Sequence, residues 1–142
     1  MKSTIIITTY NERQNIDGLI KSIINSQEDF HIIIVDDNSP DGTGEIADKL
    51  ALEFKQVKVI HRARKLGLGT AYMEGFKRAL KEGADYIFEM DADFSHDPKS
   101  LPNFMEAIKD NDLVLGSRYV RGGGVVNWPF RRLLLSKMAS FY

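Results

Sequence analysis

Two aspartates in the segment 87–98, IFEMDADFSHDP, have the type and spacing of a metal site. An apolar run up to Met90 predicts a strand, and Asp91 and Asp93 follow it directly. In extended backbone, side chains at positions i and i+2 point to the same side, so both carboxylates would face one point. Such carboxylates repel each other unless a cation or a proton lies between them. The pair therefore indicates Mg²⁺ or Mn²⁺ shared with substrate phosphates, and the alternative for a single Asp-x-Asp triplet is a solvated loop.

Polar side chains also follow two other apolar runs, at the points where we expect strands to end. The runs 5–7 and 32–35 contain only isoleucine and valine, which favours buried strands. Tyr-Asn-Glu at 10–12 follows the first run, and Asp36 and Asp37 follow the second. The carboxyl ends of parallel strands share one sheet edge, where open α/β sheets bind ligands. We expect Glu12 and Asp37 to accept hydrogen bonds from a nucleoside there, and the alternative for the two aspartates is a turn cap.

The elements that must position these residues alternate along the chain. Apolar periodicity predicts helices around 16–24, 46–50, 71–80 and 101–108, and further strands at 57–60, 87–90 and 113–115. We expect Thr43 to cap the second helix, Gly83 to end the third and Pro98 to open the fourth. This order predicts an α/β fold with three layers and a mostly parallel sheet. Arg118, after the run 113–115, would meet phosphate charge directly.

Composition excludes several classes of function. A chain of 142 residues with 43% hydrophobic and 27% charged residues is typical of one soluble globular domain. The net charge of −1 gives no overall attraction to nucleic acid. The absence of cysteine excludes a disulfide framework, a thiolate metal site and a thiol nucleophile. No apolar run approaches the roughly 18 residues of a membrane span, and the N-terminus lacks a signal-peptide core.

Two basic segments leave alternatives open. The loop 61–69 holds Arg62, Arg64 and Lys65, which would either be solvated or contact phosphate. After three glycines at 122–124, the segment 128–138 combines aromatic, leucine and basic residues. It would belong either to the core of a further part of the protein or to a membrane surface that binds lipid phosphate. Because this helix-like segment stops with the chain, we expect the C-terminal part to be incomplete.

Five sequence blocks resemble the dolichyl-phosphate mannosyltransferases, which are inverting GT-A glycosyltransferases of family 2. The blocks are TTYNERQNI, IIIVDDNSPDGT, RKLGLGTAYMEGFKRAL, MDADFSHDP and GSRYVRGGG with the W, RR and S that follow. A Tyr-Asn-Glu or Asp-x-Asp triplet alone is common, whereas five blocks in order over residues 5–137 are specific. The resemblance implies a Rossmann-like GT-A fold, with residues 1–121 as the nucleotide-sugar-binding core. It also implies that 122–142 begin an acceptor-side, membrane-facing helix.

The resemblance further implies transfer of mannose from GDP-mannose to a polyprenyl (dolichyl) phosphate with Mg²⁺ or Mn²⁺. The catalytic residues would be Asp93 and Arg118. By position, the substrate-binding residues would be Thr8 (where the family usually has proline), Tyr10 and Glu12 for the nucleotide; Val35 and Asp37 for base and ribose; Asp91, Ala92, Asp93 and Ser95 for metal and diphosphate; Arg118 for phosphate; and Arg132 and Ser136 for the acceptor. Asp91, Asp93 and Ser95 would be the metal ligands.

Alternatives remain within and beyond this family. Nothing in the predicted strands distinguishes guanine from uracil, so a UDP-sugar transferase of the UDP-glucose type is one alternative. A non-catalytic nucleotide-binding fragment is another. A response-regulator receiver also has an acidic strand end, but it begins at that strand and needs a later Lys-Pro pair, which does not follow Ser117. We expect a lipid acceptor, no nucleic-acid partner, and a peripheral location at the cytoplasmic face of a membrane.

Overall fold

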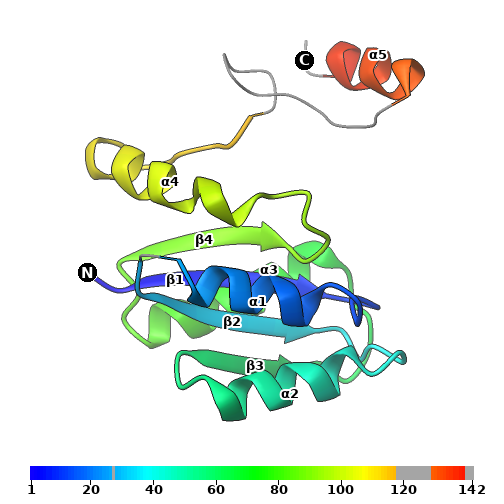
Figure 1. The fold of residues 1–142 in the computed structure, drawn as a ribbon, viewed down its shortest axis with the longest axis vertical. Helices are drawn as coiled ribbons and strands as arrows, with labels where there is room; N and C mark the ends of the chain where they lie inside the picture. Colours follow the sequence, from blue (N-terminus) through cyan, green and yellow to red (C-terminus); the bar gives the residue numbers. More distant parts are fainter. Residues whose placement is uncertain (27, 118–128, 140–142) are drawn as a thin grey trace. The chain divides into compact units, whose positions relative to one another are not determined.

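Four β-branched and aromatic runs form a parallel sheet in the computed structural model, which describes residues 1–26, 28–117 and 129–139. The strands are β1 (Ser3–Thr9), β2 (Phe30–Asp36), β3 (Val57–His61) and β4 (Tyr86–Asp91), in the spatial order β3-β2-β1-β4 (Figure 1). Thr9 lies opposite Asp36, and Thr8 lies opposite Asp91. Because this register aligns the carboxyl ends of the strands, the polar residues that follow them emerge at one edge.

Helices cover both faces of the sheet, as the predicted three-layer α/β fold requires. Helices α1 (Ile16–Ile24) and α2 (Thr43–Glu53) lie on one face, and α3 (Leu68–Lys81) lies on the other (Figure 1). Side chains of the central strand β1 alternate between the two layers. Ile5 and Ile7 belong to the core under α1 and α2, whereas Ile6 packs with Ala71 and Ala79 of α3. This confirms the predicted fold class.

The structure confirms the predicted end of α3 and contradicts the predicted start of α2. Gly83 follows the end of α3 with φ +75°. Its N–H donates to the carbonyl of Leu80, and the N–H of Ala84 donates to the carbonyl of Ala79, each at 3.0 Å. The prediction that Thr43 caps α2 is wrong, because Thr43 is the first helical residue. Its N–H and hydroxyl both donate to Oδ1 of Asp41, at 3.0 and 2.6 Å, so that carboxylate holds the turn instead.

The fourth predicted helix is present, and the last predicted strand is not. Pro98–Ser100 form a 3₁₀ turn, which leads into α4 (Leu101–Ala107) and is followed by a second 3₁₀ turn, Ile108–Asp110. In the described chain, residues 113–115 form no strand, and Leu113 and Leu115 are 72% and 78% exposed. A three-residue apolar run becomes a strand only where another strand accepts its backbone hydrogen bonds, and no described strand does so here.

The chain divides into two compact units, Met1–Glu106 and Ala107–Tyr142. The second unit contains α5 (Phe130–Ala139). Arg118, the glycines at 122–124 and Trp128 lie outside the described residues. The division of function between 1–121 and 122–142 stays a prediction. Among the described residues, no helix is long and apolar enough to cross a membrane.

Candidate functional site

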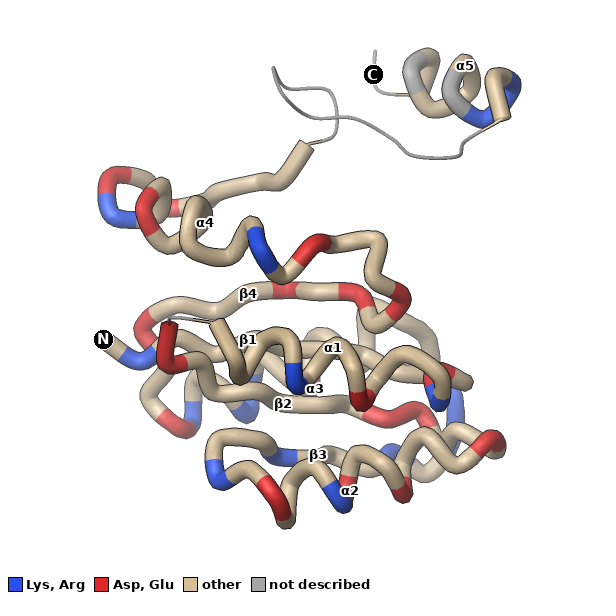
Figure 2. Tube along the Cα trace, in the orientation of Figure 1, with Lys and Arg blue, Asp and Glu red and all other residues tan. Residues whose placement is uncertain are grey.

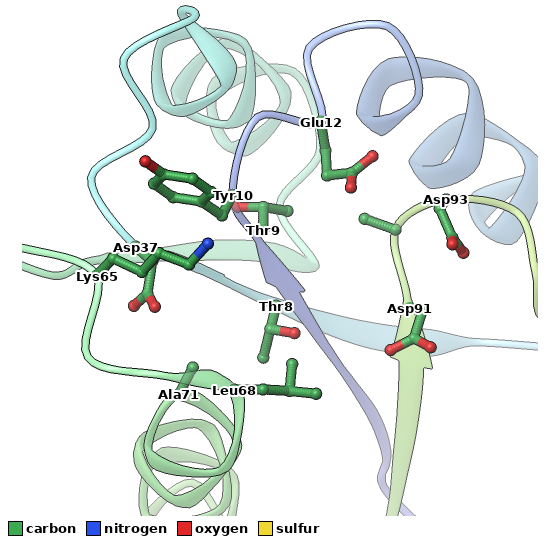
Figure 3. Close-up of a pocket in the computed structure, with 11 residues that line it drawn as sticks. Thr8, Thr9, Tyr10, Glu12, Asp37, Lys65, Leu68, Ala71, Asp91 and Asp93 are labelled. Atoms are coloured by element: carbon green, nitrogen blue, oxygen red, sulfur yellow. The ribbon is translucent and has the colours of Figure 1, made fainter.

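A pocket of about 270 Å³ lies at the carboxyl edge of the sheet in the first unit (Figure 3). Its walls come from the ends of β1, β2 and β4, from the loop before α3 and from the start of α3 itself. The lining residues are Thr8, Thr9, Tyr10, Glu12, Asp37, Lys65, Leu68, Ala71, Asp91, Ala92 and Asp93. The predicted meeting of three strand ends is thereby confirmed. Figure 2 shows acidic residues gathered at the same edge, after β2 and β4.

The two consecutive aspartates after β2 have different environments. Asp36 is 2% exposed and accepts hydrogen bonds from the hydroxyls of Thr9 (2.9 Å) and Ser39 (2.6 Å) and from the Ser39 N–H (3.0 Å). It therefore holds the turn, which was the structural alternative for the pair. Asp37 is 5% exposed and lines the pocket, as the ligand-binding interpretation expects.

In the basic loop between β3 and α3, Arg62 has neither of the two environments that we predicted for it. Its side chain is neither solvated nor turned toward a phosphate, because it is only 5% exposed and its Nη1 lies 2.5 Å from Oδ1 of Asp37. No local sequence pattern signals this long-range pair. Lys65 does line the pocket, and its Nζ lies 3.7 Å from the centroid of the Tyr10 ring (Figure 3).

The end of β4 brings Asp91 and Asp93 to the pocket in a different way from the one expected. The strand ends at Asp91, and Asp93 lies in a turn that continues to Phe94 with φ +59°. The alternation of side chains at i and i+2 does not apply here, because the backbone is no longer extended at Asp93. Oδ1 of Asp91 accepts from the Tyr72 hydroxyl at 3.2 Å, and Oδ1 of Asp93 accepts from the Ser95 N–H at 2.9 Å.

These two carboxylates fit a partial site for a hard divalent cation. The side chain and the N–H of Ser95 both hydrogen-bond Asp93 and lower the pKa of its carboxyl, which favours the ionised form. Burial, together with the nearby Asp91 charge, raises the pKa of Tyr72, so its hydroxyl stays a donor. The described residues contain no group of three His, Cys, Asp or Glu able to hold a metal. Further oxygen ligands would have to come from a diphosphate and water, as is common for Mg²⁺.

The remaining predicted site residues lie elsewhere. Val35 is fully buried in the core beneath α3, so its side chain does not face the pocket. Ser95 is exposed and contacts Asp93. Arg132 and Ser136 lie on α5 in the second unit, and their roles, like that of Arg118, stay predictions. The pocket residues that we did not predict as ligands are Thr9, Leu68 and Ala71, of which two belong to the block RKLGLGTAY. For Lys65, solvation and phosphate contact were the two predicted alternatives, and its position in the pocket lining is compatible with the second.

Known proteins resemble this chain along nearly its whole length. The family described as Glycosyl transferase family 2 matches residues 4–141. A polyprenol monophosphomannose synthase of Mycolicibacterium smegmatis is 48% identical over 99% of this chain and 54% of its own length. An undecaprenyl-phosphate mannosyltransferase of Micrococcus luteus is 45% identical (100% and 58%), and a dolichol-phosphate mannosyltransferase of Pyrococcus furiosus is 46% identical (98% and 39%). The chain thus spans about half the length of these relatives.

Solved structures share the fold of a large part of this chain. TarS of S. aureus, residues 1–349, has a TM-score of 0.65 at 24% identity and covers 78% of this chain and 33% of its own. The mannosyltransferase PcManGT of Pyrobaculum calidifontis, solved with GDP-Man and Mn²⁺, has a TM-score of 0.55 at 22% identity and covers 65% and 27%. The parallel sheet, the pocket at its carboxyl edge and a family match over residues 4–141 agree, and the chain belongs to glycosyl transferase family 2.

Proposed function

We propose that the whole protein transfers mannose from GDP-mannose to the phosphate of a polyprenol. The observation that supports this most strongly is the 45–48% identity to three relatives, each named for joining mannose to a polyprenyl phosphate. The pocket supplies a matching set of groups: acceptors for a nucleoside, a cation on one wall and a carboxylate pair for a metal. These groups suit a nucleoside diphosphate better than an uncharged ligand.

Five of the residues that line the pocket have a physical role in this proposal. Glu12 and Asp37, which line the pocket, accept hydrogen bonds from the ribose or the base, and Tyr10 forms an aromatic wall beside the bound nucleoside. Val35 would contact the nucleoside through its backbone, since its side chain is buried. Asp91 and Asp93 would hold Mg²⁺ or Mn²⁺, which when bound supplies Lewis-acid neutralisation of the departing diphosphate.

The chemistry needs few protein groups. The acceptor is already a phosphate anion, so no side chain has to remove a proton before the attack. One phosphate oxygen forms a bond to the anomeric carbon as the bond to the diphosphate breaks, and attack from the opposite face inverts that carbon. Catalysis then depends on holding the donor in place and on stabilising the charge that develops on its diphosphate.

We also propose that the protein lies at the cytoplasmic face of a membrane, where it would meet a polyprenyl phosphate. Helix α5 supports this location, because Phe130, Leu134, Leu135 and Met138 are between 50% and 76% exposed. Its sequence, FRRLLLSKMA, contains basic residues and no acidic one. Exposed apolar and basic side chains on one short helix suit the headgroup region of an anionic bilayer.

Calorimetric titration of GDP and UDP, with and without Mn²⁺, tests the donor site. We expect GDP to bind, with an affinity that Mn²⁺ raises at least tenfold. In Asp93→Asn the affinity without metal should persist while the gain from Mn²⁺ disappears, because one ionised ligand is lost. Glu89→Gln is the matched control, since Glu89 is an exposed carboxylate on β4 outside the pocket lining.

Each outcome of these titrations bears on the proposal. Preference for UDP would replace GDP-mannose with a UDP-sugar donor. If neither nucleotide binds, the pocket is not a donor site in this chain. An equal gain from Mn²⁺ in Asp93→Asn and in the parent chain would remove Asp93 from the metal site.

A further inference from the structure

We propose that Arg62 is a positioning residue for nucleoside recognition, which acts by fixing the carboxylate of Asp37. The inference rests on the proposed nucleotide-binding function of the pocket. Arg62 does not line the pocket, but it contacts Asp37, which does. The ligand class that it serves is a hydrogen-bond donor, such as a ribose hydroxyl or a base N–H.

The Arg62–Asp37 pair is buried, so its geometry is well defined. The two side chains are 5% and 7% exposed, and Nη1 of Arg62 lies 2.5 Å from Oδ1 of Asp37. Removing one partner of such a pair leaves the other charge buried without its counterion, which is strongly unfavourable. Asp37 therefore depends on Arg62 for the position of its carboxylate.

The rest of the guanidinium is anchored on α3. Nη2 donates to the hydroxyl of Thr70 at 2.7 Å, and Nη1 lies 3.5 Å from the carbonyl oxygen of Gly67. Nε lies 3.2 Å from Oε2 of Glu74 but makes no hydrogen bond with the described residues, so Glu74 contributes only its charge. The backbone N–H of Arg62 donates to the carbonyl of Asp36 at 2.9 Å. Because a guanidinium is planar and its donors have fixed directions, these contacts determine the orientation of Nη1. Arg62 thus connects the ends of β2 and β3 with the first turns of α3.

This arrangement leaves one side of Asp37 available to a ligand. Oδ1 receives the bond from Arg62, whereas the one hydrogen bond that Oδ2 accepts from the described residues comes from the N–H of Leu66, at 3.4 Å. A carboxylate oxygen can accept a second hydrogen bond, so Oδ2 can bind a donor in the pocket. The loop after Arg62 also places Lys65 over the ring of Tyr10. Loosening Arg62 would disturb two walls of the nucleoside side of the pocket at once.

A double-mutant cycle on nucleotide affinity tests this role. GDP is titrated without metal into the parent chain, Arg62→Met, Asp37→Asn and the double variant, well below their melting temperatures. We expect each single substitution to weaken binding about tenfold, in line with the loss of a charge-assisted hydrogen bond worth about 1.4 kcal/mol or more. The double variant should bind no worse than the weaker single one, because both changes remove the same contact.

Two conservative variants and one control complete the experiment. Arg62→Lys keeps the charge but loses the fork, and Thr70→Val removes one anchor of Nη2, so both should weaken GDP binding by a smaller factor. His61→Gln should leave the affinity unchanged, because His61 precedes Arg62 in the chain and pairs with exposed Asp48 outside the pocket. These variants keep the inference testable if Arg62→Met does not fold.

The possible results separate this inference from the proposed function. Folded variants of Arg62 and Thr70 with the parent affinity for GDP would limit Arg62 to a structural role and overturn the inference alone. If the losses of GDP affinity in the two single variants add fully in the double variant, Arg62 does not act through Asp37. If the parent chain binds neither GDP nor UDP, the proposed donor site and this inference both fail.

Discussion

In the part of the chain that the structure describes, three residues other than glycine adopt positive φ, and each lies two or three positions after a strand that ends at the pocket. They are Asn11 (φ 63°) after β1, Asn38 (φ 57°) after β2 and Phe94 (φ 59°) after β4. Asparagine enters this left-handed region with little strain, whereas phenylalanine rarely does so. Each residue reverses the chain within a few positions of its strand. Backbone strain of this kind often persists where a binding site requires it, which agrees with the position of Phe94 next to Asp93.

Glu82, at the opposite edge of the sheet from the pocket, gives stability that depends on pH. Its carboxylate contacts Nζ of Lys58 at 2.7 Å and Nε of Arg78. Partial burial raises the pKa of Glu82, but the hydrogen bonds from Lys58 and Arg78 outweigh it and lower the pKa to about 2. Since this lies below the ordinary value of 4.5, the stabilisation is complete above pH 4.5 and is lost as the pH falls toward 2.

We expect Glu82→Gln to reduce the free energy of unfolding at pH 7 by about 1 kcal/mol, a figure discounted because Lys58 and Arg78, which hydrogen-bond the carboxylate, are half exposed. Urea denaturation at pH 7, 5 and 3 should show the difference from the parent chain shrinking at the lowest pH. Asp17→Asn, which breaks an exposed pair with Lys21, should change stability much less. A difference that stays constant from pH 7 to pH 3 would contradict the ionic origin of the effect.

At the scale of elements, α3 packs against β1 without room for a side chain at Gly75. A Cβ there would overlap with Cγ2 of Ile6, a fully buried residue, and would lie 3.2 Å from its Cδ1. The close approach matters for the site, because α3 carries the pocket residues Leu68 and Ala71 and also Tyr72, which contacts Asp91. The space between α3 and β1 is therefore too small for any residue larger than glycine at position 75.

Gly75→Ala should lower the free energy of unfolding by about 1–3 kcal/mol, because the overlap forces α3 away from the sheet. Gly69→Ala is the matched control in the same helix. A Cβ at Gly69 meets nothing within 4 Å, so alanine there should stabilise α3 by up to about 1 kcal/mol through its higher helix propensity. Denaturant titrations of both variants measure the contrast, and two changes of the same sign would be evidence against this packing argument.

How much of these elements could be predicted depends on how local their causes are. Isoleucine and valine runs, helical periodicity and the left-handed Gly83 are local, and the strands, helices and turn they predict are present. The ion pair between Arg62 and Asp37 joins residues 25 positions apart, so no pattern within one element reveals it. The prediction of a strand at 113–115 was wrong because a strand also depends on a distant partner. No described strand pairs with these residues.

At the scale of the whole molecule, the strand order explains why the pocket lies where it does. From β1 the sheet grows through β2 to β3 in one direction, and β4 joins β1 on the other side. The crossover direction therefore reverses between β1 and β4, and open α/β sheets bind ligands at such a switch point. Thr8 and Asp91, which lie opposite each other in the register of β1 and β4, both line the pocket. The topology of the first unit thus brings Asp91 and Asp93 into the same pocket as Glu12 and Asp37.

The second unit leads to a prediction about membranes, because α5 has no acidic residue and exposes Leu134 and Leu135. We expect the chain to sediment with vesicles that contain phosphatidylserine and much less with neutral phosphatidylcholine vesicles, since basic side chains are attracted only to the anionic surface. Replacing both leucines with glutamine should abolish sedimentation by removing the apolar part of the contact.

Leu52→Gln is the control, because Leu52 is 89% exposed but stands alone on α2. Binding that ignores lipid charge, or that survives the double substitution, would mean that α5 is not the membrane contact.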